Sequence, residues 1–196
     1  MGLGTGNMTR TAALAGALLL ALASGAGAEN VAPALTVAQA RASMVGDWKA
    51  ELQYRDYQSG KWQGIPFKTS ITMVGDGVTQ IRTSAYDDGP KAGTVWITSV
   101  SLLAKDGTTE YTGTYRAGRP AEHETAKLRL EAGTDAAHWV LVSETNGRDD
   151  ERPARIREVT TRKGDRVTTE KQVDFADDAK EEWLVRNRTV LVQVVG

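Results

Sequence analysis

From residue 46 onward the sequence consists of short segments in which apolar and polar residues alternate, separated by Gly-containing turns. Residues 48–55 (WKAELQYR) show the pattern most cleanly, because Trp48, Leu52 and Tyr54 share one face and the charged residues share the other. Successive side chains of a β-strand point to opposite sides, so this period of two is typical of a half-buried antiparallel strand. The chain is therefore predicted to be all-β over most of its length.

Ten candidate strands can be counted, and nearly every connection between them has the length of a hairpin. They cover residues 48–55, 67–74, 78–86, 94–103, 108–116, 126–131, 138–144, 154–162, 166–175 and 183–194. Asp-Gly or Gly-Asp pairs favour hairpin turns at 76–77, 106–107 and 164–165, and Asn146-Gly147 is predicted to open a polar loop. Consecutive hairpins close most naturally into a single antiparallel up-and-down β-barrel of eight to ten strands, which leaves no exposed edge.

A short helix is predicted before the first strand, over residues 36–45 (TVAQARASMV). Thr36 is a suitable N-cap, and the Ala, Gln and Arg residues that follow are good helix formers. Gly46 is expected to end the helix, as Gly commonly does at a helix C-terminus.

The first 28 residues have the pattern of a signal peptide. Arg10 precedes an apolar run over 12–23, and Ala26-Gly27-Ala28 forms a small-x-small cleavage site. The alternative is an uncleaved anchor, but the run is shorter than the roughly 20 residues that a membrane span needs. We therefore expect a bacterial periplasmic or secreted protein in which residues 29–196 form one barrel domain without a membrane span.

Composition excludes several classes of protein. Lys and Arg number 24 against 25 Asp and Glu, and this balance is not that of a nucleic-acid-binding protein. The interleaved charges of residues 148–166 indicate cross-strand ion pairs instead. The chain has no Cys, so disulfides, thiolate metal sites and Cys nucleophiles are excluded.

The segment Gly46-Asp47-Trp48, which follows the predicted helix and opens the first strand, resembles the G-x-W motif of the lipocalin and wider calycin barrels. Residues 46–62, 151–159 and 183–189 also resemble a group of uncharacterised bacterial exported proteins. The resemblance implies that Trp48 covers one end of the barrel and that a late Arg, Arg186 or Arg188, packs on its ring. We take Trp48 and Arg186 as the expected structural pair.

The aromatic residues suggest a ligand site. If the strand faces that carry them point inward, the side chains of Tyr54, Trp96, Tyr111, Tyr115 and Trp139 line the interior, together with small residues and hydroxyls. Such a lining suits a small, largely apolar molecule. The alternative is a filled barrel without a cavity.

Catalytic and metal motifs are absent from the sequence, and we predict no cofactor and no metal site. His123, between Glu122 and Glu124, is either a weak metal ligand or general base, or an exposed loop residue. His138 is either an axial haem ligand of the nitrobindin type or an ordinary strand residue. The acidic clusters at 149–151 and 174–182 either bind calcium or keep the loops soluble.

Three hypotheses on function remain open. The leading one is an exported protein, monomeric or homodimeric, that binds a small hydrophobic ligand. The second is an enzyme with acid–base chemistry at the barrel mouth, which a cluster of titratable side chains in the pocket would favour. The third is a ligand-free interaction protein of the cell envelope, which would carry an exposed apolar patch.

Overall fold

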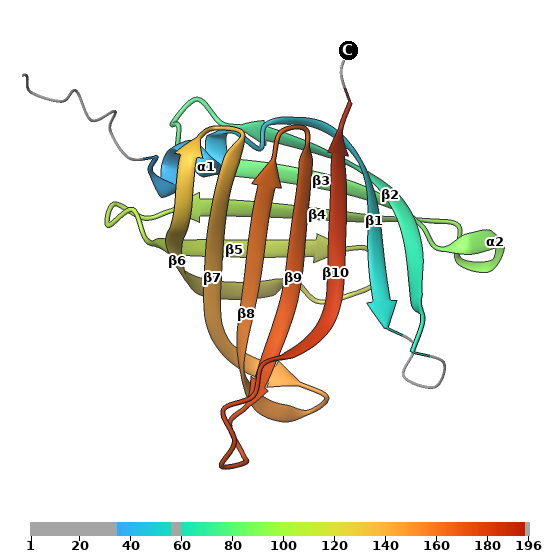
Figure 1. The fold of residues 1–196 in the computed structure, drawn as a ribbon. Helices are drawn as coiled ribbons and strands as arrows, with labels where there is room; N and C mark the ends of the chain where they lie inside the picture. Colours follow the sequence, from blue (N-terminus) through green and yellow to red (C-terminus); the bar gives the residue numbers. More distant parts are fainter. Residues whose placement is uncertain (1–34, 56–59, 195–196) are drawn as a thin grey trace, which may run out of the picture. The chain divides into compact units, whose positions relative to one another are not determined.

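The alternating segments form ten antiparallel strands, which close into a barrel in the computed structural model (Figure 1). The structure describes residues 35–55 and 60–194, so the predicted signal peptide lies outside the described residues. Each strand pairs with its neighbours in sequence, and β1 also pairs with β10, as an up-and-down barrel requires. The strands are β1 (Gly46–Arg55), β2 (Trp62–Met73), β3 (Thr79–Asp87), β4 (Thr94–Leu103), β5 (Thr109–Arg116), β6 (Glu122–Asp135), β7 (His138–Asp149), β8 (Arg152–Lys163), β9 (Arg166–Phe175) and β10 (Leu184–Gln193). The predicted all-β barrel is confirmed.

The loop predicted at Asn146-Gly147 is wrong. Both residues lie within β7, which pairs with β8 as far as Asp149 opposite Arg152. The turn is instead made by residues 150–151, and both of these non-glycine residues have positive φ, 48° and 60°. A two-residue hairpin turn with two positive φ values matches the twist of the strands, so the ladder continues past the Asn-Gly pair to this turn.

The predicted helix is confirmed as α1 (Val37–Ala42), although it is shorter than expected. Thr36 caps it through a capping box, in which the Thr36 hydroxyl accepts from the Gln39 amide N–H and the Gln39 side chain accepts from the Thr36 N–H. Its C-cap is Ser43, and Gly46 is already the first residue of β1, at φ 136°. The other helix, α2 (Gly89–Ala92), is a single turn between β3 and β4; no described helix is long and apolar enough to span a bilayer.

The hydrophobic core lies at the end of the barrel that α1 covers, which we call the helix end. Ala40 and Met44 pack there with inward-facing side chains of five strands, and all are nearly inaccessible to solvent. The strand residues are Trp48, Ile71, Trp139, Val167 and Leu191. Burying aliphatic and aromatic side chains of this size contributes about 1.5–3 kcal/mol each, so the helix end is a main source of stability.

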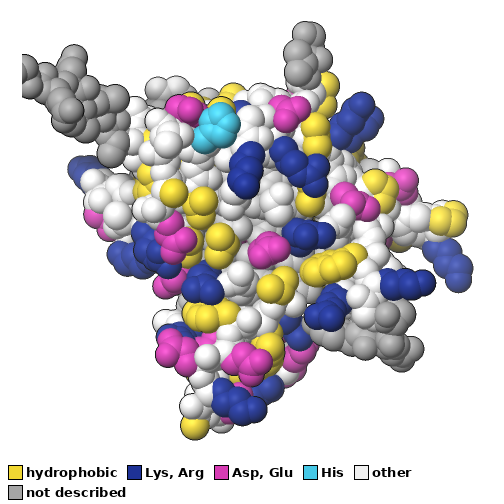
Figure 2. All heavy atoms as spheres, viewed as in Figure 1, with side chains coloured by type: hydrophobic (Ala, Val, Ile, Leu, Met, Phe, Trp, Pro, Cys, Tyr) yellow, Lys and Arg dark blue, Asp and Glu magenta, His cyan; other side chains and the backbone are white. Residues whose placement is uncertain are grey.

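The outer surface of β7 to β10 carries interleaved positive and negative side chains (Figure 2). Arg155 on β8 pairs with the buried carboxylate of Asp174 on β9, and Arg152 pairs with Asp177 in the following loop at exposed positions. The ion pairs predicted for residues 148–166 are therefore present. Exposed pairs contribute little to stability, about 0–1 kcal/mol each.

Candidate functional site

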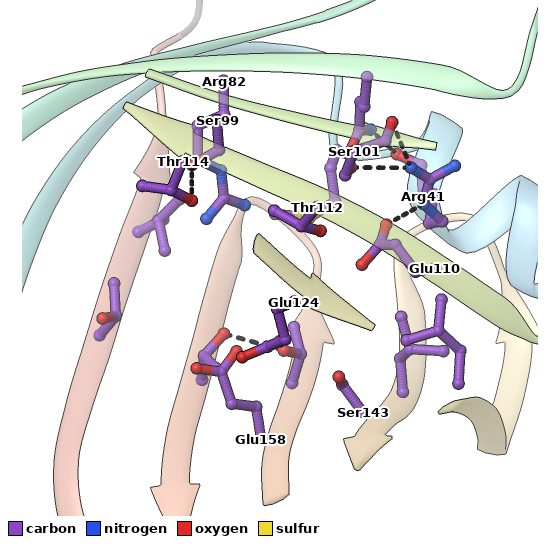
Figure 3. Close-up of a pocket in the computed structure, with 18 of the residues that line it drawn as sticks. Arg41, Arg82, Ser99, Ser101, Glu110, Thr112, Thr114, Glu124, Ser143 and Glu158 are labelled. Atoms are coloured by element: carbon purple, nitrogen blue, oxygen red, sulfur yellow. Dashed lines mark hydrogen bonds and ion pairs between the residues drawn. The ribbon is translucent and has the colours of Figure 1, made fainter. Parts of the chain in front are cut away.

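A cavity of about 490 Å³ lies inside the barrel, next to the helix end (Figure 3). Its lining is mainly polar, and the apolar contribution comes from residues of the helix end and its surroundings. Hydroxyl and amide side chains come from Gln80, Ser99, Ser101, Thr112, Thr114, Ser143, Thr160, Thr169, Asn187 and Thr189. Charged side chains come from Arg41, Arg82, Glu110, Glu122, Glu124 and Glu158, and His123 completes the polar set. This lining suits a ligand with several hydrogen-bonding groups.

The register of the sheet explains why polar residues meet there. Arg82 lies opposite Ser99, which lies opposite Thr114, and this row runs across β3, β4 and β5. A second row joins Gln80, Ser101, Thr112 and Glu124 across β3 to β6. Residues opposite one another in a sheet point to the same side, so each row presents its polar side chains to the interior together.

Three charged groups enter the cavity without a direct partner. Figure 3 shows Arg82 entering from β3 and the Glu124 and Glu158 carboxyl groups, which point toward one another, from β6 and β8. Among the described residues, none of the three forms a hydrogen bond or an ion pair, although each retains accessible surface that faces the cavity. All three side chains are accessible to solvent through the cavity, and charged groups that converge in one cavity without partners are functional candidates.

Their environment shifts all three pKa values toward the neutral forms. Burial lowers the pKa of Arg82, and the nearby carboxylate of Glu158 opposes this change. Burial raises the pKa of Glu158, and Arg82 and Lys171 oppose that rise. Burial also raises the pKa of Glu124, and the negative charge of Glu158 adds to the rise. The three groups therefore interact electrostatically across the cavity.

Arg41 lines the same cavity but is fully committed to holding α1. Its guanidinium donates to Glu110 Oε1 at 2.8 Å, to the Val78 carbonyl at 2.9 Å and to Ser101 Oγ at 2.9 Å. The Gln80 amide donates to the Arg41 carbonyl at 2.7 Å. Arg41 is 4% exposed, and its charge is balanced by Glu110. It connects α1 to β3, β4 and β5.

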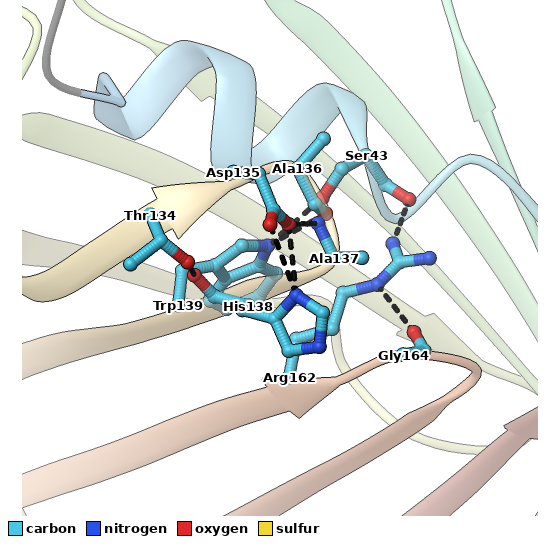
Figure 4. A network of polar contacts seen from close by, with 9 residues as sticks. All are labelled: Ser43, Thr134, Asp135, Ala136, Ala137, His138, Trp139, Arg162 and Gly164. Carbon is cyan, nitrogen blue, oxygen red and sulfur yellow. Dashed lines mark hydrogen bonds and ion pairs between the residues drawn. The ribbon is translucent and has the colours of Figure 1, made fainter. Parts of the chain in front are cut away.

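The arginine over Trp48 is Arg162 on β8, at 5.4 Å from the ring, and the predicted pairing with Arg186 is wrong. Arg162 also donates to the carbonyls of Ser43 and Gly164, which joins the end of α1 to the β8–β9 turn (Figure 4). Arg186 instead forms ion pairs with Asp149 and Asp150 near the β7–β8 turn. Trp48 pairs with residue 193 of β10, seven positions beyond Arg186, which is about 23 Å along the strand.

Of the five aromatic residues predicted to line the interior, Trp139 lines the cavity and the other four do not. Trp96, Tyr111 and Tyr115 are 60%, 50% and 49% exposed, and the inward orientation predicted for them is wrong. Their strands turn the other set of alternating side chains toward the cavity. Because side chains alternate between the two faces of a strand, choosing the wrong inward face misplaces every side chain of that strand. Tyr54 is on the inward face of β1 but lies beyond the cavity, and it is 44% exposed. Ligand binding by these aromatics stays a prediction.

The two histidines have different positions. His123 lies on β6 rather than in a loop, and it is part of the cavity lining. His138 is exposed at the start of β7, with its ring 3.0 Å from the Asp135 carboxylate (Figure 4). Over the described ranges, no group of three or more His, Asp or Glu side chains is arranged to hold a metal ion.

Sequence reasoning missed Arg82, Glu124 and Glu158 as a group. The sequence places Glu124 next to His123, and nothing in the local sequence connects Glu124 with residues 82 or 158. The three lie on strands that are not adjacent to one another, and they meet only because the barrel closes. The signal that would find them is the shared inward phase of Ser99, Thr112 and Thr114, whose hydroxyls alternate with exposed aromatics.

Comparison with known proteins supports the fold. No protein-family profile matches the chain, and no curated protein matches it either. A similar solved structure is the crystal structure of Rv2717c from M. tuberculosis, with a TM-score of 0.54 and 12% sequence identity. The alignment covers 83% of this chain and 99% of that one. At this identity the likeness shows a shared β-barrel fold.

Proposed function

We propose that this protein binds a small polar molecule inside its barrel. The observation that carries the proposal is the cavity of about 490 Å³, into which Arg82, Glu124 and Glu158 project without a hydrogen bond or ion pair to any described residue. Small-molecule sites typically have volumes of about 300–1,000 Å³ and a few convergent polar groups. The lining favours a polar ligand rather than the largely apolar one expected from the aromatic residues.

Filling the cavity tests the proposal. Thr112 faces the cavity from β5, so Thr112→Trp should occupy the ligand space. Thr125 is exposed and pairs with the outward-facing Tyr111, so Thr125→Trp adds the same bulk outside the barrel. Native mass spectrometry should find a co-purifying small molecule on the wild type and on Thr125→Trp, and none on Thr112→Trp. Titration calorimetry with sugars, amino acids, amines and organic acids should give the same pattern. Binding that survives in Thr112→Trp would contradict the proposal.

The two glutamates support an enzyme as a second candidate. Burial raises the pKa of Glu158, and a carboxyl group with a raised pKa is better suited to general acid catalysis than an ordinary one. Glu124, whose pKa is raised in part by Glu158, would be the matching base. An enzyme would be established if the wild type converts a bound compound and Glu158→Gln binds the same compound without converting it. Equal recovery of intact ligand from both would exclude this role for Glu158.

Export and a calycin relationship are parts of the same proposal. The signal-peptide pattern of residues 1–28 supports a periplasmic or secreted location, and mass spectrometry of the cell fractions should find a mature chain that begins at Glu29. A full-length chain in the cytoplasm would contradict export. Trp48 at the closed end, with an arginine over its ring, supports a calycin-like barrel.

A further inference from the structure

We infer that the ligand of the cavity is a small zwitterion whose ammonium group lies between Glu124 and Glu158 and whose carboxylate lies against Arg82. This inference rests on the proposed function and names the chemical class of the molecule. It follows from the balance of charge, the lack of an ion pair between Arg82 and the two glutamates among the described residues, and the hydroxyls beside each of them.

The charges that line the cavity do not balance. Four glutamates face two arginines there, and one of each is used in the pair between Arg41 and Glu110 at 2.8 Å. The remaining guanidinium, on Arg82, faces an excess of carboxylates. The Glu124 and Glu158 carboxylates point toward one another (Figure 3) and repel, so the solvent-accessible cavity favours a ligand that brings a positive group between them.

In the part of the chain that the structure describes, no ion pair joins Arg82 to Glu124 or Glu158, although the Arg82 charge opposes the rise in the pKa of Glu158. The cavity therefore has a positive pole on β3 and a negative pole on β6 and β8 (Figure 3). A molecule with opposite charges at its two ends satisfies both poles at once. A carboxylic acid alone leaves the glutamates unpaired, an amine alone leaves Arg82 unpaired, and a neutral sugar compensates neither.

Hydroxyl groups accompany each pole. Ser99 and Thr114, which follow Arg82 in its row, have hydroxyl oxygens 3.1 Å apart, and the hydroxyl oxygens of Thr160 and Thr169 lie 2.9 Å apart on the wall that carries Glu158. A guanidinium can bind a carboxylate with two parallel hydrogen bonds, and neighbouring hydroxyls can donate to the remaining lone pairs of the carboxylate. An ammonium group has three donors, which two carboxylates can accept.

A matched series of probes tests the inference on the full chain. Straight-chain amino acids with the amine and the carboxylate at opposite ends, of three to eight carbons, are titrated by calorimetry. Each is compared with the amine, the carboxylic acid and the diol of the same length. At least one amino acid should bind about tenfold or more tightly than each of its three analogues, because each lost charge removes a charge-assisted hydrogen bond.

Charge variants then assign the two poles. Arg82→Gln should lower the affinity for the amino acid and for the carboxylic acid about tenfold and leave the affinity for the amine unchanged. Glu158→Gln should lower the affinity for the amino acid and for the amine. Arg129→Gln and Glu144→Gln, which alter an exposed ion pair on the outer surface, should change none of the affinities. Arg82→Met, which also removes the charge, is the substitute if Arg82→Gln does not fold.

The possible failures are distinguishable. If diols or sugars bind as tightly as the amino acids, or if both charge variants weaken all probes equally, the zwitterion is excluded while binding inside the barrel stands. If Thr112→Trp binds the probes as the wild type does, both this inference and the proposed function fail.

Discussion

Charged side chains have opposite surroundings at the helix end of the barrel and in the cavity beside it. At the helix end, Arg41 and Arg162 each have several hydrogen-bond partners that tie α1 to the strands. In the cavity, Arg82, Glu124 and Glu158 have none among the described residues. Satisfied groups stabilise a fold, whereas proteins retain unsatisfied ones where function requires them. The comparison assigns stability to the helix end and binding to the cavity.

The largest effect is expected from Trp48→Ala. Trp48 is 1% exposed, packs in the core at the helix end and donates its indole N–H to the Met44 carbonyl at 3.0 Å. The substitution leaves a large cavity and should lower the free energy of unfolding by about 4 kcal/mol. Urea denaturation followed by circular dichroism measures it. A loss below about 1 kcal/mol would mean that the helix end is not the main source of stability.

Arg41→Met should cost about 3 kcal/mol, because it leaves Glu110 without its partner in a partly buried site. Removing both partners in Arg41→Met/Glu110→Leu should recover part of that loss, since no charge is then left uncompensated. Comparing the unfolding free energies of the two single variants and the double variant measures the coupling. Strict additivity would show that the pair does not hold α1.

Glu158→Gln should change stability in the opposite direction and raise the free energy of unfolding at neutral pH, by less than about 1 kcal/mol because solvent in the cavity screens the Glu158 charge. Burial raises the pKa of Glu158 above its usual 4.5, so the folded state binds the proton more tightly than the unfolded state. This contribution to stability is present below pH 4.5 and is lost as pH rises through the folded pKa. Denaturation at a series of pH values should therefore show the advantage of Glu158→Gln growing with pH. A constant difference would contradict the raised pKa.

The smallest effect on stability is expected on the outer face of β4. Trp96 is 60% exposed, and Trp96→Ser should change the free energy of unfolding by no more than about 0.5 kcal/mol and leave ligand affinity unchanged. Trp48→Ala is its matched counterpart inside the barrel. Sedimentation of the wild type and of Trp96→Ser also tests the envelope-interaction hypothesis, because Trp96 lies among exposed apolar residues. Weaker self-association of Trp96→Ser would mark that face as an interface.

Much of the fold could be predicted because its signals are local. Alternation along residues 94–103 and 166–175 identified β4 and β9 with the same limits that the structure has. Thr36 was recognisable as an N-cap from its place before a run of helix formers. The turn at residues 150–151 was missed because Asp and Glu are weak turn signals beside Asn-Gly, and strand pairing outweighed the local preference.

By itself, the sequence determined which side chains share a strand face, where most strands turn, and that the strands close on their neighbours. Only the tertiary structure decided which face points inward. Alternation separates the two faces of a strand but does not tell which of them points inward. In β4 and β5 the hydroxyl face lies inside and the aromatic face lies outside. Contacts between distant strands were decided in the same way, and they place Arg162 rather than Arg186 over Trp48 and bring Arg82, Glu124 and Glu158 to one cavity. These contacts depend on the register of ten paired strands around a closed ring, which no short stretch of sequence encodes.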